Sequence, residues 1–217
     1  MSNGSNYLKT MIDTQSRRDR RIAARQTQIL DAAAHVFSQK GYQNATTKEI
    51  AEMADVSEGT LYNYFANKRD LLIGVARAYA DEIMADMASI QPEGYEDLLA
   101  QFMANRFRRG RERRLFMVFL HESRWNEDVR RYYVEEAMHH IIAQTEQHMG
   151  NLIERGTLRN VDPTIAARTM SATIMGFAAL FELGITVNHS SPELLGTQVT
   201  DILWNGLRNQ EENGREP

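Results

Sequence analysis

The sequence TKEIAEMADVSEGTLYNYFANK, residues 47–68, predicts two short helices joined by a tight turn. Ile50, Ala51 and Ala54 fall on one face of the first helix, and apolar residues return at helical spacing from Leu61 onward. Helices this short are marginal on their own, so both must pack against another part of the chain. The pattern is typical of a helix-turn-helix, in which two helices cross at a wide angle.

The turn between these two helices, residues 54–57, carries its own signals. Such a turn usually needs one residue at positive φ, and Asp tolerates that region better than most residues, which makes Asp55 the candidate. Ser57 can cap the second helix with its hydroxyl, because the first amides of a helix lack partners within it. Thr46 or Thr47 can cap the first helix in the same way. These residues predict where each helix begins.

The same residues resemble the DNA-binding domain of TetR-family transcriptional regulators. The matching positions are Thr46, Thr47, Ile50, Ala51, Ala54, Val56, Ser57, Gly59, Thr60, Leu61, Tyr62, Tyr64, Phe65, Lys68, Leu71 and Leu72. The family most often has Gly where this chain has Asp55. The resemblance implies an all-α subunit of about this length, with a second helical domain for ligand binding and dimerisation, that acts as a homodimer.

In a helix-turn-helix the second helix enters the major groove of DNA with its N-terminal residues toward the base edges. We therefore expect hydroxyls at phosphates, an amide at a base edge, and a lysine at a phosphate beside the start of the next helix. The candidate DNA-binding residues are Thr47, Lys48, Ser57, Glu58, Gly59, Thr60, Tyr62, Asn63 and Lys68. The alternative interpretation is a solvated helical hairpin in which Tyr62 only packs against its neighbours.

Charge is distributed unevenly along the chain. The net charge of −4 argues by itself against binding to nucleic acid, but basic residues outnumber acidic ones over the first 48 residues, and acidic residues dominate the remainder. The basic stretch at residues 17–25 can follow the DNA backbone as an arm, or it can be a solvated helix start. There is no cysteine, and the longest apolar run, residues 174–181, is too short to cross a bilayer. We expect a cytoplasmic protein that binds double-stranded DNA and no membrane.

Helical periodicity continues along the chain and predicts an all-α fold of about nine helices. Gly41 is expected to end the first helix, and residues 128–155 are expected to form one long helix. The predicted organisation is a disordered tail at 1–16, a helix-turn-helix DNA-binding domain at 17–68, a ligand-binding and dimerisation domain at 69–209, and a frayed tail at 210–217.

The last two predicted helices have the features of a dimer interface. The helix that Pro163 opens is apolar nearly all round as far as residue 183, so it must be buried on both sides. We expect these helices to form a four-helix bundle with those of a second copy. The predicted interface residues are Phe181, Leu195, Val199, Ile202, Leu203 and Gly206. The alternative is that both helices only fill the core of one subunit.

The helices before the predicted interface are those that the family uses to wall a ligand pocket, and Met and aromatic side chains adapt to bulky apolar ligands. The candidate ligand-binding residues are Phe102, Met103, Arg106, Phe116, Phe119, Trp125, Tyr133, Met170, Thr173 and Phe177. Residues 116–177 also resemble fatty-acid-linked members of the family, chiefly at residues 152–158 and at Asp162-Pro163. A fatty acyl-CoA is therefore one candidate among small apolar or amphipathic effectors.

The stretch RFRRGRERR at residues 106–114 carries six arginines around a helix break. Arginine forks match phosphate oxygens, so this cluster could receive a phosphate or the headgroup of a CoA thioester. The alternative, in which these arginines are solvated and pair with nearby carboxylates, is favoured, because a charge run is usually a solvated face.

No arrangement of residues in the sequence supports catalysis. His121-Glu122 begins like a zinc-protease motif, but Trp125 occupies the position of the second histidine, and we expect neither a metal nor a cofactor. The favoured function is a ligand-responsive DNA-binding regulator, usually a repressor, that binds a palindromic operator as a dimer and is released by a small, largely apolar effector. The alternatives are a helical ligand-binding or scaffold protein whose helix-turn-helix no longer binds DNA, and a small helical enzyme.

Overall fold

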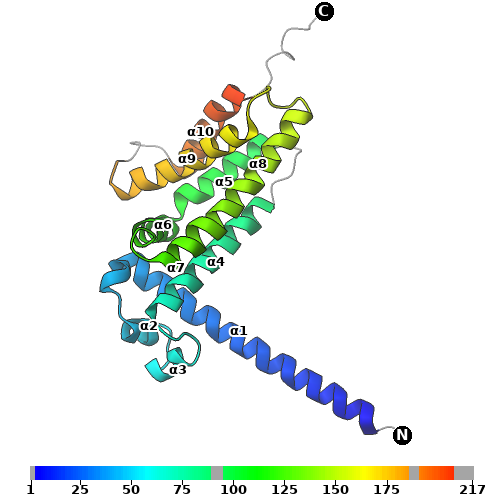
Figure 1. Cartoon of the computed structure of the whole chain (residues 1–217), viewed down its shortest axis with the longest axis vertical. Coiled ribbons are helices and arrows are strands. Elements are labelled where there is room, and N and C mark those ends of the chain that lie inside the picture. The colour runs from blue at the N-terminus through cyan, green and yellow to red at the C-terminus, as the bar shows by residue number, and fades with distance from the viewer. Residues whose placement is uncertain (1–2, 89–94, 186–190, 208–217) are drawn as a thin grey trace, which may run out of the picture. The chain divides into compact units, whose positions relative to one another are not determined.

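The computed structural model describes residues 3–88, 95–185 and 191–207, and it confirms the prediction of an all-α fold. The chain forms two compact units, the first ending at Val75 and the second beginning at Ala76. The division between these two units falls inside α4 (Lys68–Ala88), and the predicted domain bounds of 17–68 and 69–209 stay predictions. The predicted frayed tail at 210–217 lies outside the described residues. Figure 1 shows the elements of each unit.

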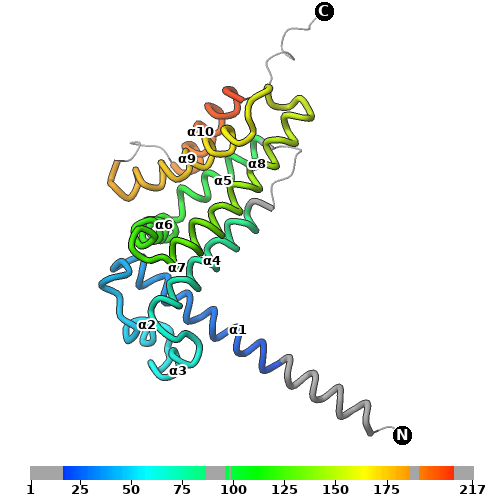
Figure 2. Tube along the Cα trace, viewed as in Figure 1, coloured from blue at the N-terminus to red at the C-terminus, as the bar shows by residue number. Residues whose placement is uncertain are grey.

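The first unit contains α1 (Asn3–Asn44), α2 (Thr47–Met53), α3 (Glu58–Tyr62) and the start of α4. The disordered tail predicted at 1–16 stays a prediction. Figure 2 follows the backbone of α1 from Arg17 onward into the shorter helices α2 and α3.

The core of the first unit joins α1 to the two shorter helices. Ile29 and Phe37 of α1, Ile50 of α2 and Leu61 of α3 are completely buried, which satisfies the requirement that the short helices pack against a third. Gly41 has a φ of 73° and interrupts the helical backbone, as the sequence predicts for the end of the first helix.

The second unit comprises the remainder of α4 and the elements that follow it. These are α5 (Tyr95–Arg108), α6 (Gly110–Glu122), α7 (Glu127–Val129), a π-helix η1 (Arg130–Met138), α8 (His139–Glu154), α9 (Pro163–Glu182) and α10 (Pro192–Leu207). The single helix predicted at 128–155 is thus divided, because a nine-residue π-helix lies between α7 and α8. π-Helical turns are rare and are frequently found at functional sites. Figure 1 shows α5, α8, α9 and α10 running side by side within this unit.

α10 packs more closely against α5 than any ordinary side chain allows. A Cβ atom placed on Gly196 would lie 2.6 Å from the carbonyl oxygen of Ala100 and 2.8 Å from the amide nitrogen of Ala104. The absence of a side chain at Gly196 therefore permits the two helix backbones to approach. Leu195 and Val199, on either side of this glycine, are buried in the unit's own core together with Trp204.

α9 begins as the sequence predicts, with Asp162 accepting a hydrogen bond from the amide of Thr164 at 2.8 Å and with proline in the first turn. It is not buried on both sides within one chain, because Ile165, Leu180 and Leu183 are 60%, 39% and 67% exposed. Among the described residues, only α9 is long and apolar enough to cross a membrane, a criterion that core helices of soluble proteins also meet.

Candidate functional site

The start of α2 is held by reciprocal hydrogen bonds. The amide of Glu49 donates to the hydroxyl of Thr46 at 3.2 Å, and the amide of Thr46 donates to the Glu49 carboxylate at 3.1 Å, which is a capping box. Lys40 forms an ion pair with the same carboxylate, and this contact and the bonds to Thr46 lower the pKa of Glu49. Of the two caps that the sequence allows, the structure uses Thr46.

The turn and the start of α3 follow the sequence prediction. Asp55 has a φ of 49°, so the residue expected at positive φ adopts it. The hydroxyl of Ser57 accepts a hydrogen bond from the amide of Thr60 at 3.0 Å and lies 2.9 Å from the hydroxyl of Thr60. Gly59 is exposed, and a Cβ atom there would meet only Ser57, at 3.8 Å. Local packing therefore does not require glycine here, and its backbone is open to a close approach.

Three predicted DNA-binding side chains contact one another across the motif. The hydroxyl of Thr47 on α2 donates to the carboxylate of Glu58 at 2.9 Å and lies 3.0 Å from the hydroxyl of Tyr62. The Tyr62 side chain is 48% exposed, and Lys48 and Asn63 are also exposed. The structure thus brings together residues from both helices on one accessible surface.

Lys68 has partners that sequence reasoning did not anticipate. Its ammonium group donates to the backbone carbonyls of Tyr42, Gln43 and Ala45 at 2.9, 3.3 and 2.9 Å, and it lies 4.5 Å from the centre of the Tyr42 ring. Three carbonyls match the three donors of an ammonium group. Lys68 therefore ties the start of α4 to the segment that follows the Gly41 kink. The phosphate contact expected for Lys68 stays a prediction.

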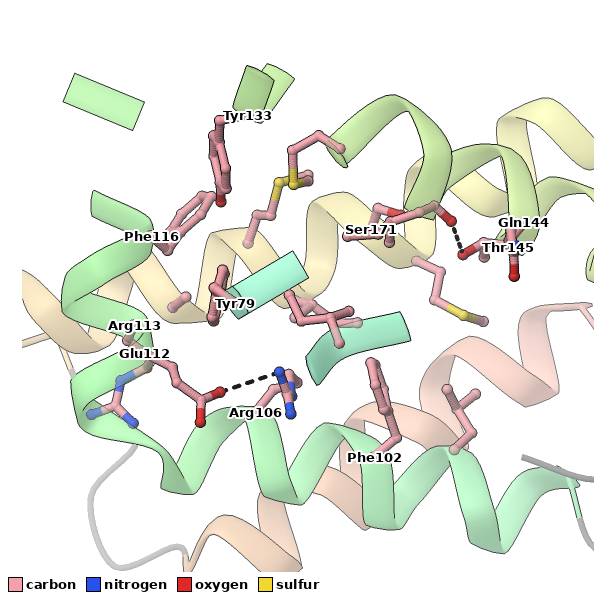
Figure 3. Close-up of a pocket in the computed structure, with 18 of the residues that line it drawn as sticks. Tyr79, Phe102, Arg106, Glu112, Arg113, Phe116, Tyr133, Gln144, Thr145 and Ser171 are labelled. Carbon is pink, nitrogen blue, oxygen red and sulfur yellow. Dashed lines mark hydrogen bonds and ion pairs between the residues drawn. The ribbon is translucent and has the colours of Figure 1, made fainter. Parts of the chain in front are cut away.

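The second unit encloses a cavity of about 310 Å³ (Figure 3). Its wall is built from five helices and the π-helix, and most of it is apolar. The lining residues are Tyr79, Ile83, Leu99, Phe102, Arg106, Glu112, Arg113, Phe116, Tyr133, Met138, Ile141, Gln144, Thr145, His148, Met170, Ser171, Ile174, Met175 and Ala178. This volume is at the lower end of the range for pockets that bind small organic molecules.

Half of the predicted ligand-binding residues line this cavity, namely Phe102, Arg106, Phe116, Tyr133 and Met170. Met103 and Phe119 are completely buried in the core, whereas Trp125 is 76% exposed. The hydroxyl of Thr173 donates to the carbonyl of Thr169 at 2.8 Å within α9, and the ring of Phe177 packs 5.2 Å from that of Phe107.

The cavity also has polar lining residues that sequence reasoning missed. Glu112 follows Arg106 at the start of α6, and Gln144, Thr145 and Ser171 interrupt otherwise apolar helix faces. Such polar residues on an apolar face are the signal that could have identified them, because buried polar groups require partners.

Four of the six arginines in the 106–114 stretch have carboxylate partners. Arg106, whose side chain is 6% exposed, forms ion pairs with Asp86 and with Glu112, the latter at 3.2 Å. Arg109 contacts Glu112 at 3.1 Å, and Arg108 pairs with Glu193 on α10. Arg113 pairs with Glu182 on α9 at 3.1 Å. These pairs match the favoured interpretation of the cluster, although they join helices and do not lie in a solvated loop.

Burial changes the acid–base properties of the groups that line the cavity. Loss of solvation raises the pKa of Tyr79 to about 12, and it also raises the pKa of Tyr133 well above its ordinary value. Loss of solvation also raises the pKa of Glu112, and the charge of Arg106 opposes this change. The pKa of His148 is lowered by burial and by Arg155, so its imidazole is neutral at pH 7.

Two family descriptions match the chain. Residues 29–75 match bacterial regulatory proteins of the tetR family, and residues 97–200 match the C-terminal domain of AefR-like transcriptional repressors. The HTH-type transcriptional regulator YvkB of Bacillus subtilis is 39% identical over 71 residues, which are 33% of this chain and 38% of that protein. The RutR regulator of Escherichia coli is 34% identical over 82 residues, 38% of this chain and 39% of its own length.

Solved structures share the fold over most of the chain. A transcriptional regulator of Saccharomonospora viridis in complex with choline has a TM-score of 0.72 at 19% identity, covering 87% of this chain and all of that one. FadR of Bacillus subtilis in complex with stearoyl-CoA has a TM-score of 0.64 at 23% identity, covering 83% and 98%. The curated relatives are matched over less than half of their length. With both family matches together spanning most of the described helices, this chain belongs to the TetR family of transcriptional regulators.

Proposed function

We propose that this TetR-family regulator is a cytoplasmic repressor that binds a palindromic DNA operator as a homodimer. A small, largely apolar effector that occupies the cavity releases it from the operator. The observation that carries the DNA-binding part is the accessible surface around α3. This surface includes the hydrogen bond from Thr47 to Glu58. It also presents the exposed backbone of Gly59 and the exposed side chains of Tyr62, Lys48 and Asn63. Hydroxyl, amide and ammonium donors are the groups that contact phosphates and base edges.

We expect Tyr62→Ala to weaken operator binding at least tenfold without lowering the unfolding midpoint. Tyr62 is half exposed and its hydroxyl contacts only Thr47 within the motif, so its loss removes a DNA contact and little packing. Fluorescence anisotropy would be measured with a labelled fragment from the promoter region of the protein's own gene, at two salt concentrations. Affinity for DNA should fall steeply with salt, because phosphate neutralisation releases counterions.

The matched control for this experiment is Trp125→Ala, which removes an exposed aromatic side chain outside the first unit. Lys68 is unsuitable for a test of DNA contact, because its removal would leave three carbonyls without their donor. Equal binding by wild type and Tyr62→Ala, or no binding to any fragment, would favour a helical ligand-binding or scaffold protein.

The proposed dimer uses the exposed stripe of α9 that runs through Ile165, Ala172, Gly176, Leu180 and Leu183. These residues recur at helical spacing on one face, and covering an apolar stripe of this length stabilises association. Of the predicted interface residues, Phe181 and Leu203 are half-buried and Ile202 and Gly206 are exposed, which leaves them available. Leu195 and Val199 instead contribute to the core of one chain, so α10 would meet a second copy through its other face.

Gly176→Arg is expected to convert a dimer into a monomer while leaving each chain folded. No atom lies within 4 Å of a Cβ atom at Gly176, so the fold has room for the side chain, whereas an arginine in a close helix contact would be left buried without a partner. Sedimentation velocity measures the change as a halving of the particle mass. Gly150→Arg on α8, where a Cβ atom also meets nothing within 4 Å, is the control and should leave the mass unchanged.

The proposed route from effector to DNA is α4. This helix begins at Lys68 in the first unit and supplies Tyr79 and Ile83 to the cavity wall in the second. Two recognition helices must lie about 34–36 Å apart to enter successive major grooves. An effector that binds a different spacing of the two recognition helices more tightly, by several kcal/mol, would release the operator. An effector with equal affinity for the two spacings would leave operator binding unchanged.

A fatty acyl-CoA is a second candidate effector. The Fatty acid metabolism regulator protein of Bacillus subtilis is 46% identical over 48 residues, 22% of this chain and 25% of that protein, and the FadR structure contains stearoyl-CoA. Against this candidate, Arg106, Arg108, Arg109 and Arg113 already pair with carboxylates. Palmitoyl-CoA is therefore one of the compounds with which effector binding should be measured.

A further inference from the structure

The charged groups in the cavity wall compensate one another. Arg106 is paired with Asp86 and Glu112, and Arg113 is paired with Glu182. The Arg113 guanidinium also donates to the carbonyl of Phe107. A ligand that carries a full charge would have to enter this wall against pairs that are already formed, and it would lose its own hydration.

The hydroxyl of Tyr133 is one of the wall groups that have no hydrogen-bond partner among the described residues. The Tyr133 side chain is 2% exposed, and its ring packs 4.7 Å from that of Phe119. The buried hydroxyl has no hydrogen-bond partner among the described residues, and Figure 3 shows it directed into the cavity, toward Phe116 and Tyr79. A buried polar atom without a partner costs free energy, and native structures contain few of them.

A second donor lies in the same wall. The Nε atom of Arg106 is buried and has no hydrogen-bond partner among the described residues, although the guanidinium as a whole is paired through its Nη atoms. Within the described residues, the cavity wall therefore contains two buried donors without a hydrogen-bond partner, from Tyr133 and Arg106, and one such acceptor, the Oε2 atom of Glu112. The surface around them is apolar and is formed by groups such as Phe102, Phe116 and Ile174. Donors of this kind fix the orientation of an otherwise apolar ligand.

We propose that the effector is an uncharged, mainly hydrocarbon compound of one to a few rings that carries a carbonyl or hydroxyl oxygen, and that this oxygen accepts a hydrogen bond from Tyr133. The inference rests on the proposed function, because it assigns the chemical class of the effector. The cavity volume of about 310 Å³ suits a small ring system. The neutral state of His148 at pH 7 adds no charge to the wall.

The test uses four naphthalene probes of similar size together with palmitoyl-CoA. 2-Acetylnaphthalene carries a carbonyl oxygen, 2-isopropenylnaphthalene has the same shape without the oxygen, 2-naphthoate is an anion, and 2-naphthylmethylammonium is a cation. Titration calorimetry with the full chain should give the tightest binding for the ketone. Removal of one hydrogen bond, by the isopropenyl probe or by Tyr133→Phe, should weaken binding about fivefold.

Tyr132→Phe is the matched control variant. Tyr132 neighbours Tyr133 on the π-helix, but its ring lies 3.9 Å from the guanidinium of Arg77 and it does not line the cavity. Its substitution should leave the affinity for the ketone unchanged. Because the isopropenyl probe tests the hydrogen bond on the ligand side, the result does not depend on the folding of a variant.

Tighter binding of naphthoate, the ammonium probe or palmitoyl-CoA than of the ketone would overturn the inference, and so would equal affinity of wild type and Tyr133→Phe for the ketone. DNA binding measured on the same samples separates this outcome from failure of the proposed function. A protein that binds its promoter fragment but none of the neutral probes refutes only the effector class. A protein that binds neither DNA nor any probe refutes the proposed function as well.

Discussion

Replacing Arg106 by methionine is expected to lower the free energy of unfolding by about 3 kcal/mol at neutral pH. Removing one member of a buried ion pair costs about 3–5 kcal/mol, because the remaining charge stays buried without its partner. The low end applies here, since the side chain of Glu112 is 9% exposed but that of Asp86 is 29% exposed and keeps contact with water. Urea denaturation followed by circular dichroism measures the change.

The penalty of Arg106→Met should depend on pH in a defined direction. Burial already raises the folded-state pKa of Glu112, so this group binds protons more tightly in the folded than in the unfolded chain. Its contribution to stability is therefore present at low pH and is lost as pH rises from the ordinary carboxyl pKa through the folded value. Without the opposing charge of Arg106 this pKa rises further, and the penalty should be larger at pH 7.5 than at pH 5.

Arg108→Met is the control for this prediction. Arg108 lies on the same helix and pairs with Glu193, but both side chains are more than half exposed. Exposed ion pairs contribute about 0–1 kcal/mol, so the control should change stability by no more than that at either pH. If Arg108→Met and Arg106→Met cost the same, the buried pair is not a significant source of stability.

Replacing Gly196 by alanine is expected to cost about 2–3 kcal/mol of unfolding free energy. The new methyl group would lie 2.6 Å from the carbonyl oxygen of Ala100 and 2.8 Å from the amide nitrogen of Ala104, and backbone atoms of a helix cannot move aside as a flexible side chain can. Overpacking of a well-packed core costs about 1–3 kcal/mol, and contact with backbone places this site at the upper end. The midpoint of urea denaturation should fall accordingly.

The same substitution should weaken effector binding. α5 carries Phe102 and Arg106 into the cavity wall, so a displacement of α5 by α10 also displaces these side chains. The control is Gly150→Ala on α8, where a Cβ atom meets nothing within 4 Å and alanine favours the helix by up to about 1 kcal/mol. Gly196→Ala with the stability of wild type would show that the two helices separate at little cost.

The helix-turn-helix could be predicted from sequence because its signals are local. The hydroxyl of Ser57 caps an amide three residues away, and Asp55 sets the turn through its own backbone, so neither depends on the rest of the fold. Lys68 differs, because its partners, the carbonyls of Tyr42, Gln43 and Ala45, lie more than twenty residues earlier. The place of Lys68 at the start of a helix predicted a phosphate contact, but it contained no information on the α1 kink.

The cavity and the interface could be predicted only in part, for a physical reason. Apolar periodicity shows which face of a helix avoids water, but not what covers that face. Leu195 and Val199 are buried against their own chain, whereas Ile202 on the same helix is 72% exposed. Met103 and Phe102 are adjacent in sequence, yet only Phe102 lines the cavity. Choosing between these outcomes requires the positions of all neighbouring helices.

The π-helix at Arg130–Met138 marks a place where the chain can lose one residue without a change in the faces of the helix that follows. A π-helical turn closes its hydrogen bonds one residue later than an α-helical turn. Deleting one residue from a regular α-helix rotates everything beyond it by about 100°. Deleting the exposed Val134 would instead let the segment become α-helical, and α8 would keep the faces that it presents now. A gap of one residue is therefore tolerated better here than at any regular turn of the same unit.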